Sequence, residues 1–125
     1  MTRLRYWLTA KTQYNIHSPF IFDLYNEVLF SRLNKTGEMY THLVYKFSDH
    51  FGMKIDNSDE NTTTFIPGKV FEQLLIVNHP HKNKKAEAQL QEISDSGKYN
   101  VILDLYDAAV LFLRPAMHAQ RYLLK

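Results

Sequence analysis

The chain contains no cysteine, and only four glycines and four prolines among its 125 residues. Without cysteine there can be no disulfide framework, no thiolate metal site and no cysteine nucleophile. The longest apolar runs, Leu74–Val77 and Ala108–Leu113, are far too short to cross a bilayer. Lys11 and Gln13 interrupt the first apolar segment, which argues against a secretory signal peptide. These absences predict a cytoplasmic protein with no membrane partner.

The residues that are present indicate a folded globular chain. Hydrophobic residues make up 45% and aromatic residues 14% of the sequence, which argues against intrinsic disorder. The length fits a single domain over residues 1–125, with a helical part over 1–52 and a strand–helix–hairpin part over 63–125. The formal net charge of +2 is nearly balanced, so the composition predicts no nucleic-acid partner.

Helical signals dominate the first third of the chain. Ser18 is expected as an N-cap with Pro19 at the first helical position, because Ser accepts a backbone hydrogen bond and Pro has no N–H to lose there. That helix is expected to end near residue 30 and to bury a stripe of aromatic residues: Phe20, Phe22, Tyr25 and Phe30. Apolar spacing predicts another helix over about 38–51, followed by Gly52 as a left-handed C-terminal residue.

The sequence changes character after Gly52. Residues 56–62 are polar and acidic, which predicts a solvated loop, and the β-branched residues of 63–66 predict a short strand that stops at a Pro-Gly turn. The unbroken apolar segment Leu74–Val77 predicts a strand that is covered on both faces.

The last third predicts a helix and a hairpin. The helix is expected over 82–94, and the hairpin strands over 99–106 and 108–114 with a tight turn at Asp107. The tail is expected to be a short helix or an extended segment. A strand–helix–strand order favours parallel pairing of the strands on either side of the helix. The final strand is then expected to lie antiparallel at or near the edge of the sheet.

Two segments resemble a bacterial family of class I S-adenosylmethionine-dependent methyltransferases. Tyr14–Leu24, which contains His17-Ser18-Pro19-Phe20, is similar to that family's amino-terminal signature. Lys82–Arg114 is similar to its final helix and closing hairpin, and the two segments occur in the family's order. The resemblance implies a reduced Rossmann-like α/β sandwich, with a short mixed sheet and the amino-terminal helices packed on it.

The features that would bind the methyl donor are missing from the sequence. A donor site of this kind needs a glycine-rich turn, because glycine lets the backbone approach the cofactor closely. The four glycines are Gly37, Gly52, Gly68 and Gly97, and none lies within a dozen residues of another. The sequence therefore predicts a non-catalytic, methyltransferase-like scaffold with no cofactor and a protein-interaction or structural role. The alternative is a methyltransferase or small-molecule-binding protein with a rebuilt pocket.

Four polar residues are the candidates for site chemistry, and no catalytic, cofactor-binding or metal-binding role is assigned to any of them. His17 and Ser18 form a histidine–hydroxyl pair, but the N-cap role explains Ser18 and no acid or oxyanion element accompanies the pair. His79 and His81 follow the buried strand, where two imidazoles could contribute to a metal site. No third ligand is evident nearby, so a loop is the preferred interpretation.

One structural prediction follows from the missing donor-binding strands. Their removal from a methyltransferase sheet would leave Leu74–Val77 at an edge, with unpaired backbone groups and no charge to protect it. We expect this edge to be covered by residues 63–66, by the first helices, or by a second copy of the chain. The last possibility makes a homodimer one of the expected partners, beside another protein.

Overall fold

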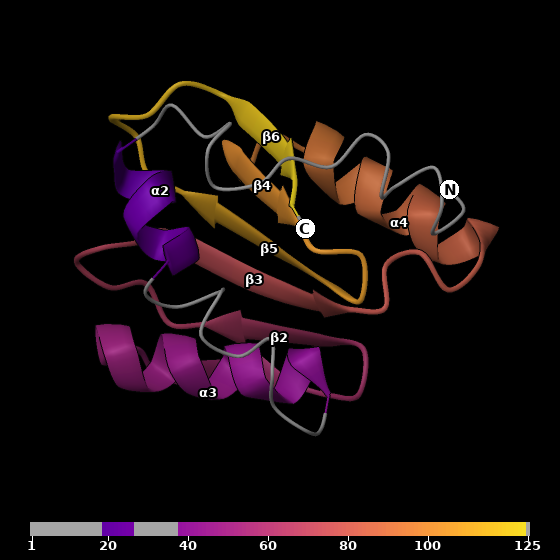
Figure 1. The fold of residues 1–125 in the computed structure, drawn as a ribbon, viewed down its shortest axis with the longest axis horizontal. Helices are drawn as coiled ribbons and strands as arrows, with labels where there is room; N and C mark the ends of the chain where they lie inside the picture. Colours follow the sequence, from indigo (N-terminus) through magenta and orange to yellow (C-terminus); the bar gives the residue numbers. More distant parts are fainter. Residues whose placement is uncertain (1–18, 27–37, 125) are drawn as a thin grey trace.

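The computed structural model describes residues 19–26 and 38–124, which form a six-stranded mixed sheet with helices packed against it (Figure 1). The elements in chain order are α2 Pro19–Leu24, α3 Met39–Phe51, β1 Ile55–Ser58, β2 Thr62–Phe65, β3 Gln73–Asn78, α4 Lys84–Asp95, β4 Val101–Asp104, β5 Ala108–Leu113 and β6 Gln120–Leu123. The mixed α/β class predicted from the sequence is confirmed at this level.

The strands are arranged in the order β1-β2-β3-β5-β4-β6, and only β4 and β6 pair in parallel. Because β5 is antiparallel to both β3 and β4, these two strands run in the same direction. The prediction that they pair directly is wrong, because β5 lies between them. The prediction that the final hairpin strand lies at the edge is also wrong. Five of the six residues of β5 are buried and none is charged, so β5 suits an interior position.

A hairpin of β1 and β2 covers the open edge of β3. Thr62, Thr63 and Thr64 of β2 lie opposite Val77, Ile76 and Leu75 of β3 in antiparallel register. This pairing confirms the first of the three covers expected for that edge.

The prediction of a solvated loop over 56–62 is wrong in part, because β1 occupies the beginning of that segment. All four β1 residues are exposed and the β1–β2 register contains a bulge, so this edge strand lacks the alternation by which strands are recognised.

The main core lies on one face of the sheet, beneath α2 and α3. Ile21 and Leu43 from these helices join Leu74, Val110 and other inward-facing strand residues in one buried cluster. The core therefore draws on both the helical part and the strand part of the chain. On the opposite face, Leu90 of α4 packs with a smaller group from the sheet: Leu75, Ile102, Ala109 and Leu111. Alternate residues along β3, β4 and β5 thus serve the two cores.

An aromatic cluster joins the helices to the sheet. The buried ring of Phe71 packs edge-on against Phe20 of α2, Phe51 of α3 and Phe112 of β5, with ring centroids 4.8–5.9 Å apart. Tyr25 is buried as predicted, but Phe22 is 38% exposed, so the predicted stripe is wrong at that position. The buried residues of α2 are Ile21 and Leu24, and Phe22 does not share their three-residue spacing. Phe30 lies outside the described residues.

The boundaries of α3 and α4 agree with their sequence signals to within two residues. The end expected near residue 30 for the first helix lies outside the described residues, and α2 ends at Leu24. The helix predicted over 38–51 is α3, and Gly52 follows it with a φ of 62°, in the left-handed region that glycine adopts without strain. The later helix begins at Lys84 instead of residue 82, because the Asn83 side chain accepts a hydrogen bond from the Ala86 N–H and caps it.

Hydrogen bonds attach the β1–β2 hairpin to α3. The Tyr40 hydroxyl donates to the carbonyl oxygen of Asp59 at 2.9 Å and lies 2.6 Å from the hydroxyl oxygen of Thr63. That Thr63 oxygen also lies 2.8 Å from the Ser58 hydroxyl, and the Thr63 side chain is fully buried. The hairpin is therefore fixed from both sides, by its ladder with β3 and by this buried hydroxyl cluster.

Candidate functional site

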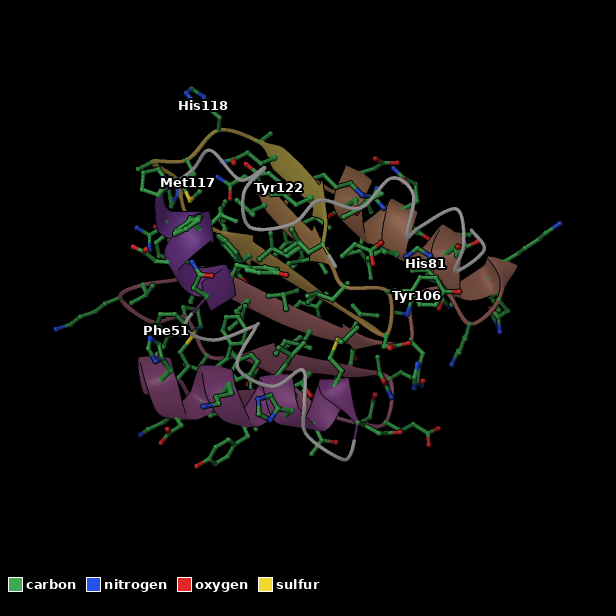
Figure 2. The ribbon with its side chains drawn as sticks, in the orientation of Figure 1. Phe51, His81, Tyr106, Met117, His118 and Tyr122 are labelled. Atoms are coloured by element: carbon green, nitrogen blue, oxygen red, sulfur yellow. The ribbon has the colours of Figure 1, made fainter. Side chains whose placement is uncertain are left out.

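A cluster of charged groups surrounds the imidazole of His81, in the loop between β3 and α4. The His81 Nε2 atom lies 2.6 Å from Oδ2 of Asp104, and Nδ1 lies 2.6 Å from Oε2 of Glu87. The Tyr106 ring stacks on the imidazole, with centroids 5.0 Å and planes 21° apart; both residues are labelled in Figure 2. The side chains of His81 and Asp104 are only 5% and 0% exposed. The contact between them is therefore withdrawn from bulk water.

Three elements bring these groups together. Asp104 is the last residue of β4, and its second oxygen accepts the Tyr106 N–H at 2.9 Å. This bond supports the left-handed backbone of Tyr106, whose φ is 69°, in the manner of an Asx-turn. Glu87 belongs to the first turn of α4, where a negative charge is favoured by the helix dipole. One aspartate therefore shapes the β4–β5 turn and also holds the loop histidine.

Backbone hydrogen bonds attach the same loop to its surroundings. The His79 N–H donates to the carbonyl oxygen of Asp107 at 2.9 Å, and the Asn78 N–H donates to that of Asn61 at 2.7 Å. His79 adopts a left-handed φ of 47°. The loop that follows β3 is thus connected to the β4–β5 turn on one side and to the β1–β2 hairpin on the other.

The charge state of His81 follows from its surroundings. Burial disfavours the charged ring, but the hydrogen bonds and negative charges of Asp104 and Glu87 outweigh that cost, so the pKa of His81 is raised above its ordinary 6.5. A protonated imidazole can donate from both nitrogens, and each carboxylate can accept one bond. The neutral ring has one N–H only. We therefore describe the cluster as a carboxylate–imidazolium–carboxylate bridge.

The raised pKa makes stability depend on pH. Because the folded protein holds the proton more tightly than the unfolded chain, the contribution of His81 is fully present below pH 6.5 and is lost as the pH rises through the folded pKa. We expect urea unfolding to give a lower free energy at about pH 9 than at about pH 6. His81→Gln should reduce this difference. An unchanged pH dependence in the variant would show that other groups cause it.

The bridge is poorly suited to acid–base or metal chemistry. A general base needs a ring nitrogen within reach of a substrate proton, whereas both nitrogens of His81 face carboxylates. The same contacts occupy the lone-pair positions that a metal would need. Over residues 19–26 and 38–124 no group of three or more histidine, aspartate or glutamate side chains is arranged to hold a metal ion. The geometry therefore favours a structural role for His81.

Two of the four residues selected from the sequence, His79 and His81, lie in the described part of the chain. His17 and Ser18 lie outside the described residues. His79 is exposed, while the side chain of His81 is buried and carries the bridge. The two partners of His81 were not anticipated as site residues. Asp104 had one recognisable signal, since it is an acidic residue that ends the otherwise apolar strand Val101–Asp104. Glu87 had none, because a glutamate in the first turn of a polar helix is ordinary.

The second feature of interest is a groove beside α4, which we call the α4 groove. It has a volume of about 700 Å³ and runs between α4 and the strands β2 and β3. Its lining residues are Asn61, Thr62, Val77, Asn78, Lys82, Asn83, Lys85, Ala86, Gln89, Leu90, Glu92 and Ile93. A smaller polar hollow of about 560 Å³ shares Asn61, Asn78 and Lys82 with it. Among the described residues, the groove is bounded by α4 on one side and by Thr62 and Val77 of the sheet on the other.

Comparison with known proteins gives no family assignment: no family model, no curated protein and no solved structure matches the chain. Among the helices of the described residues, none is both long enough and apolar enough to span a membrane. The bridge, the β1–β2 hairpin and the α4 groove are therefore the features that bear on function, together with the sequence.

Proposed function

We propose that this chain is a non-catalytic scaffold of methyltransferase-like ancestry, which acts through protein interaction. The observation that carries the proposal is the position of β2. The resemblance places the missing donor-binding strands before Leu74–Val77, and the short β1–β2 hairpin now pairs along β3. The sheet is extended at that side by a hairpin with exposed outer residues instead of by the α/β units that bind the donor.

The carboxy-terminal half supports the proposed ancestry. The resemblance assigns a final helix and a closing hairpin to Lys82–Arg114, and the described residues form α4 followed by the paired strands β4 and β5 in that segment. The strands before and after α4 run in the same direction, as a crossover connection requires. These features agree with the resemblance in order and direction.

The glycines support the loss of donor binding. A donor-binding turn needs glycine immediately after a strand, where the backbone meets the cofactor. Gly52 and Gly97 instead follow α3 and α4 with φ values of 62° and 79°, and Gly68 lies in the connection between β2 and β3. The three described glycines are thus explained by helix ends and a turn. In the part of the chain that the structure describes, the loop that leads from the buried strand β3 to helix α4 contains His79 and His81 in place of glycine.

Thermal unfolding with and without the methyl donor tests this proposal. We expect S-adenosylmethionine, and equally S-adenosylhomocysteine, to leave the melting temperature unchanged. A ligand present at 100 times its Kd would add about 2.7 kcal/mol to the stability, which corresponds to a rise of roughly 10 °C for a domain of this size. A rise of that kind would support the alternative function, a methyltransferase or small-molecule-binding protein with a rebuilt pocket.

A further inference from the structure

We infer that a second copy of this chain occupies the α4 groove, so that two α4 helices pack antiparallel across a twofold axis. The inference deepens the proposed interaction role and depends on it, since it names the partner. Its starting point is the incomplete cover of the sheet. Among residues 19–26 and 38–124, the buried cluster on the α4 side draws on α4, β3, β4 and β5. Thr62 and Thr64 point to this side from β2 and stay half-exposed.

The groove offers the shape that a helix needs. Its floor includes Thr62 and Val77, and its wall is α4, with Ala86 and Ile93 facing the hollow. The small side chain of Ala86 permits a close approach of a second helix. The α4 residues that line the hollow of about 700 Å³ extend from Lys85 to Ile93, so an inserted element can lie parallel to the helix axis.

The charged residues of α4 are distributed unfavourably with respect to the helix dipole. Lys84 and Lys85 stand at the start of the helix, where its dipole disfavours positive charge, while Glu92 and Asp95 stand toward the end, where no basic residue is present in the last turn. Glu87 is the one acidic residue of the first turn, and it is engaged with His81. Most of this pattern is unfavourable within one chain. It becomes favourable when a second helix lies beside the first in the opposite direction.

A twofold contact turns this pattern into complementary pairs. Lys85 and Glu92 both line the groove and are seven residues apart, which places them about 10 Å apart on one side of the helix. In an antiparallel pair centred between them, Lys85 of each copy lies opposite Glu92 of the other. In such an isologous contact the same surface of each copy faces the other. The assembly therefore stops at a dimer, because neither copy has this surface left exposed. The same helix serves as groove wall in one copy and as insert in the other, which favours a second copy over an unrelated helix.

Sedimentation equilibrium of the full chain tests the inference by comparing the dimer dissociation constant of the wild type with that of variants in which Lys85 and Glu92 change charge. We expect the wild-type protein, studied up to about 100 µM to include weak dimers, to show a mass twice the 14.8 kDa of one chain. Lys85→Glu and Glu92→Lys should each weaken dimerisation by about tenfold or more, because each places like charges opposite one another twice. The double variant exchanges both charges and should recover the wild-type dissociation constant to within about threefold.

Lys84→Glu is the matched control, since it makes the same charge change on an exposed α4 residue that does not line the groove. It should leave the dissociation constant within about threefold of the wild type. A monomer at all concentrations, a dimer insensitive to Lys85→Glu, or a double variant that fails to recover would each overturn the inference. Because these samples contain no methyl donor, a failure here is separate from the result of the donor experiment.

Discussion

Replacement of His81 by alanine is expected to lower the free energy of unfolding by about 3–5 kcal/mol, the cost of removing one partner from a buried ion pair. The substitution removes the His81 contact from Oδ2 of Asp104, which is fully buried, and from Oε2 of Glu87. It also removes the ring on which Tyr106 stacks. Urea unfolding near neutral pH measures the change.

His118→Ala is the control for this experiment, since it removes an exposed imidazole from the loop between β5 and β6. Its effect should stay within about 0.5 kcal/mol. Adding Asp104→Asn to His81→Ala should cost less than Asp104→Asn costs in the wild type, because the two residues act as a pair. Additive losses, or a loss below about 1 kcal/mol for His81→Ala, would contradict the bridge as a source of stability.

Replacement of Phe71 by alanine is the second change with a large expected effect. Phe71 is fully buried and contacts aromatic rings from α2, α3 and β5. Truncation of a buried phenylalanine costs about 3–5 kcal/mol, against a total stability of about 5–15 kcal/mol for an ordinary domain. We therefore expect a midpoint of urea unfolding far below that of the wild type.

Phe22→Ala provides the comparison, because it deletes the same atoms from a ring that is 38% exposed on α2. Its loss should be below about 1.5 kcal/mol, since less surface is returned to water. Equal losses for the two variants would mean that the aromatic cluster around Phe71 does not connect the helices to the sheet as described.

The parts of the fold that could be predicted are those with a strong local signal. The apolar spacing of 39–51 and the glycine that follows it were enough to predict α3. The helical spacing of apolar residues stops at the position where the glycine indicates a helix end. The apolar segment Leu74–Val77 was enough to define β3. The cover of β3 by the neighbouring hairpin could also be expected, since an unprotected strand edge needs a partner.

The features that could not be predicted depend on distant contacts. The insertion of β5 between β3 and β4 concerns the order of the strands. The apolar sequence of β5 indicates an interior position but does not indicate which two strands flank it. The strand β1 has no buried side chain and therefore no pattern. The bridge joins His81 to Asp104 across 23 positions of sequence, so the pair is recognisable only when the β3–α4 loop meets the end of β4.

Calorimetric titration with S-adenosylmethionine, followed by S-adenosylhomocysteine, tests the central claim most directly. The purified full chain is titrated at ligand concentrations up to about 1 mM, enough to detect a Kd weaker than micromolar. The account predicts no saturable heat with either ligand, because the described glycines end helices or form a turn and β2 occupies the edge of β3. Saturable binding with a Kd in about the micromolar range would contradict the account and would direct attention to the methyl acceptor.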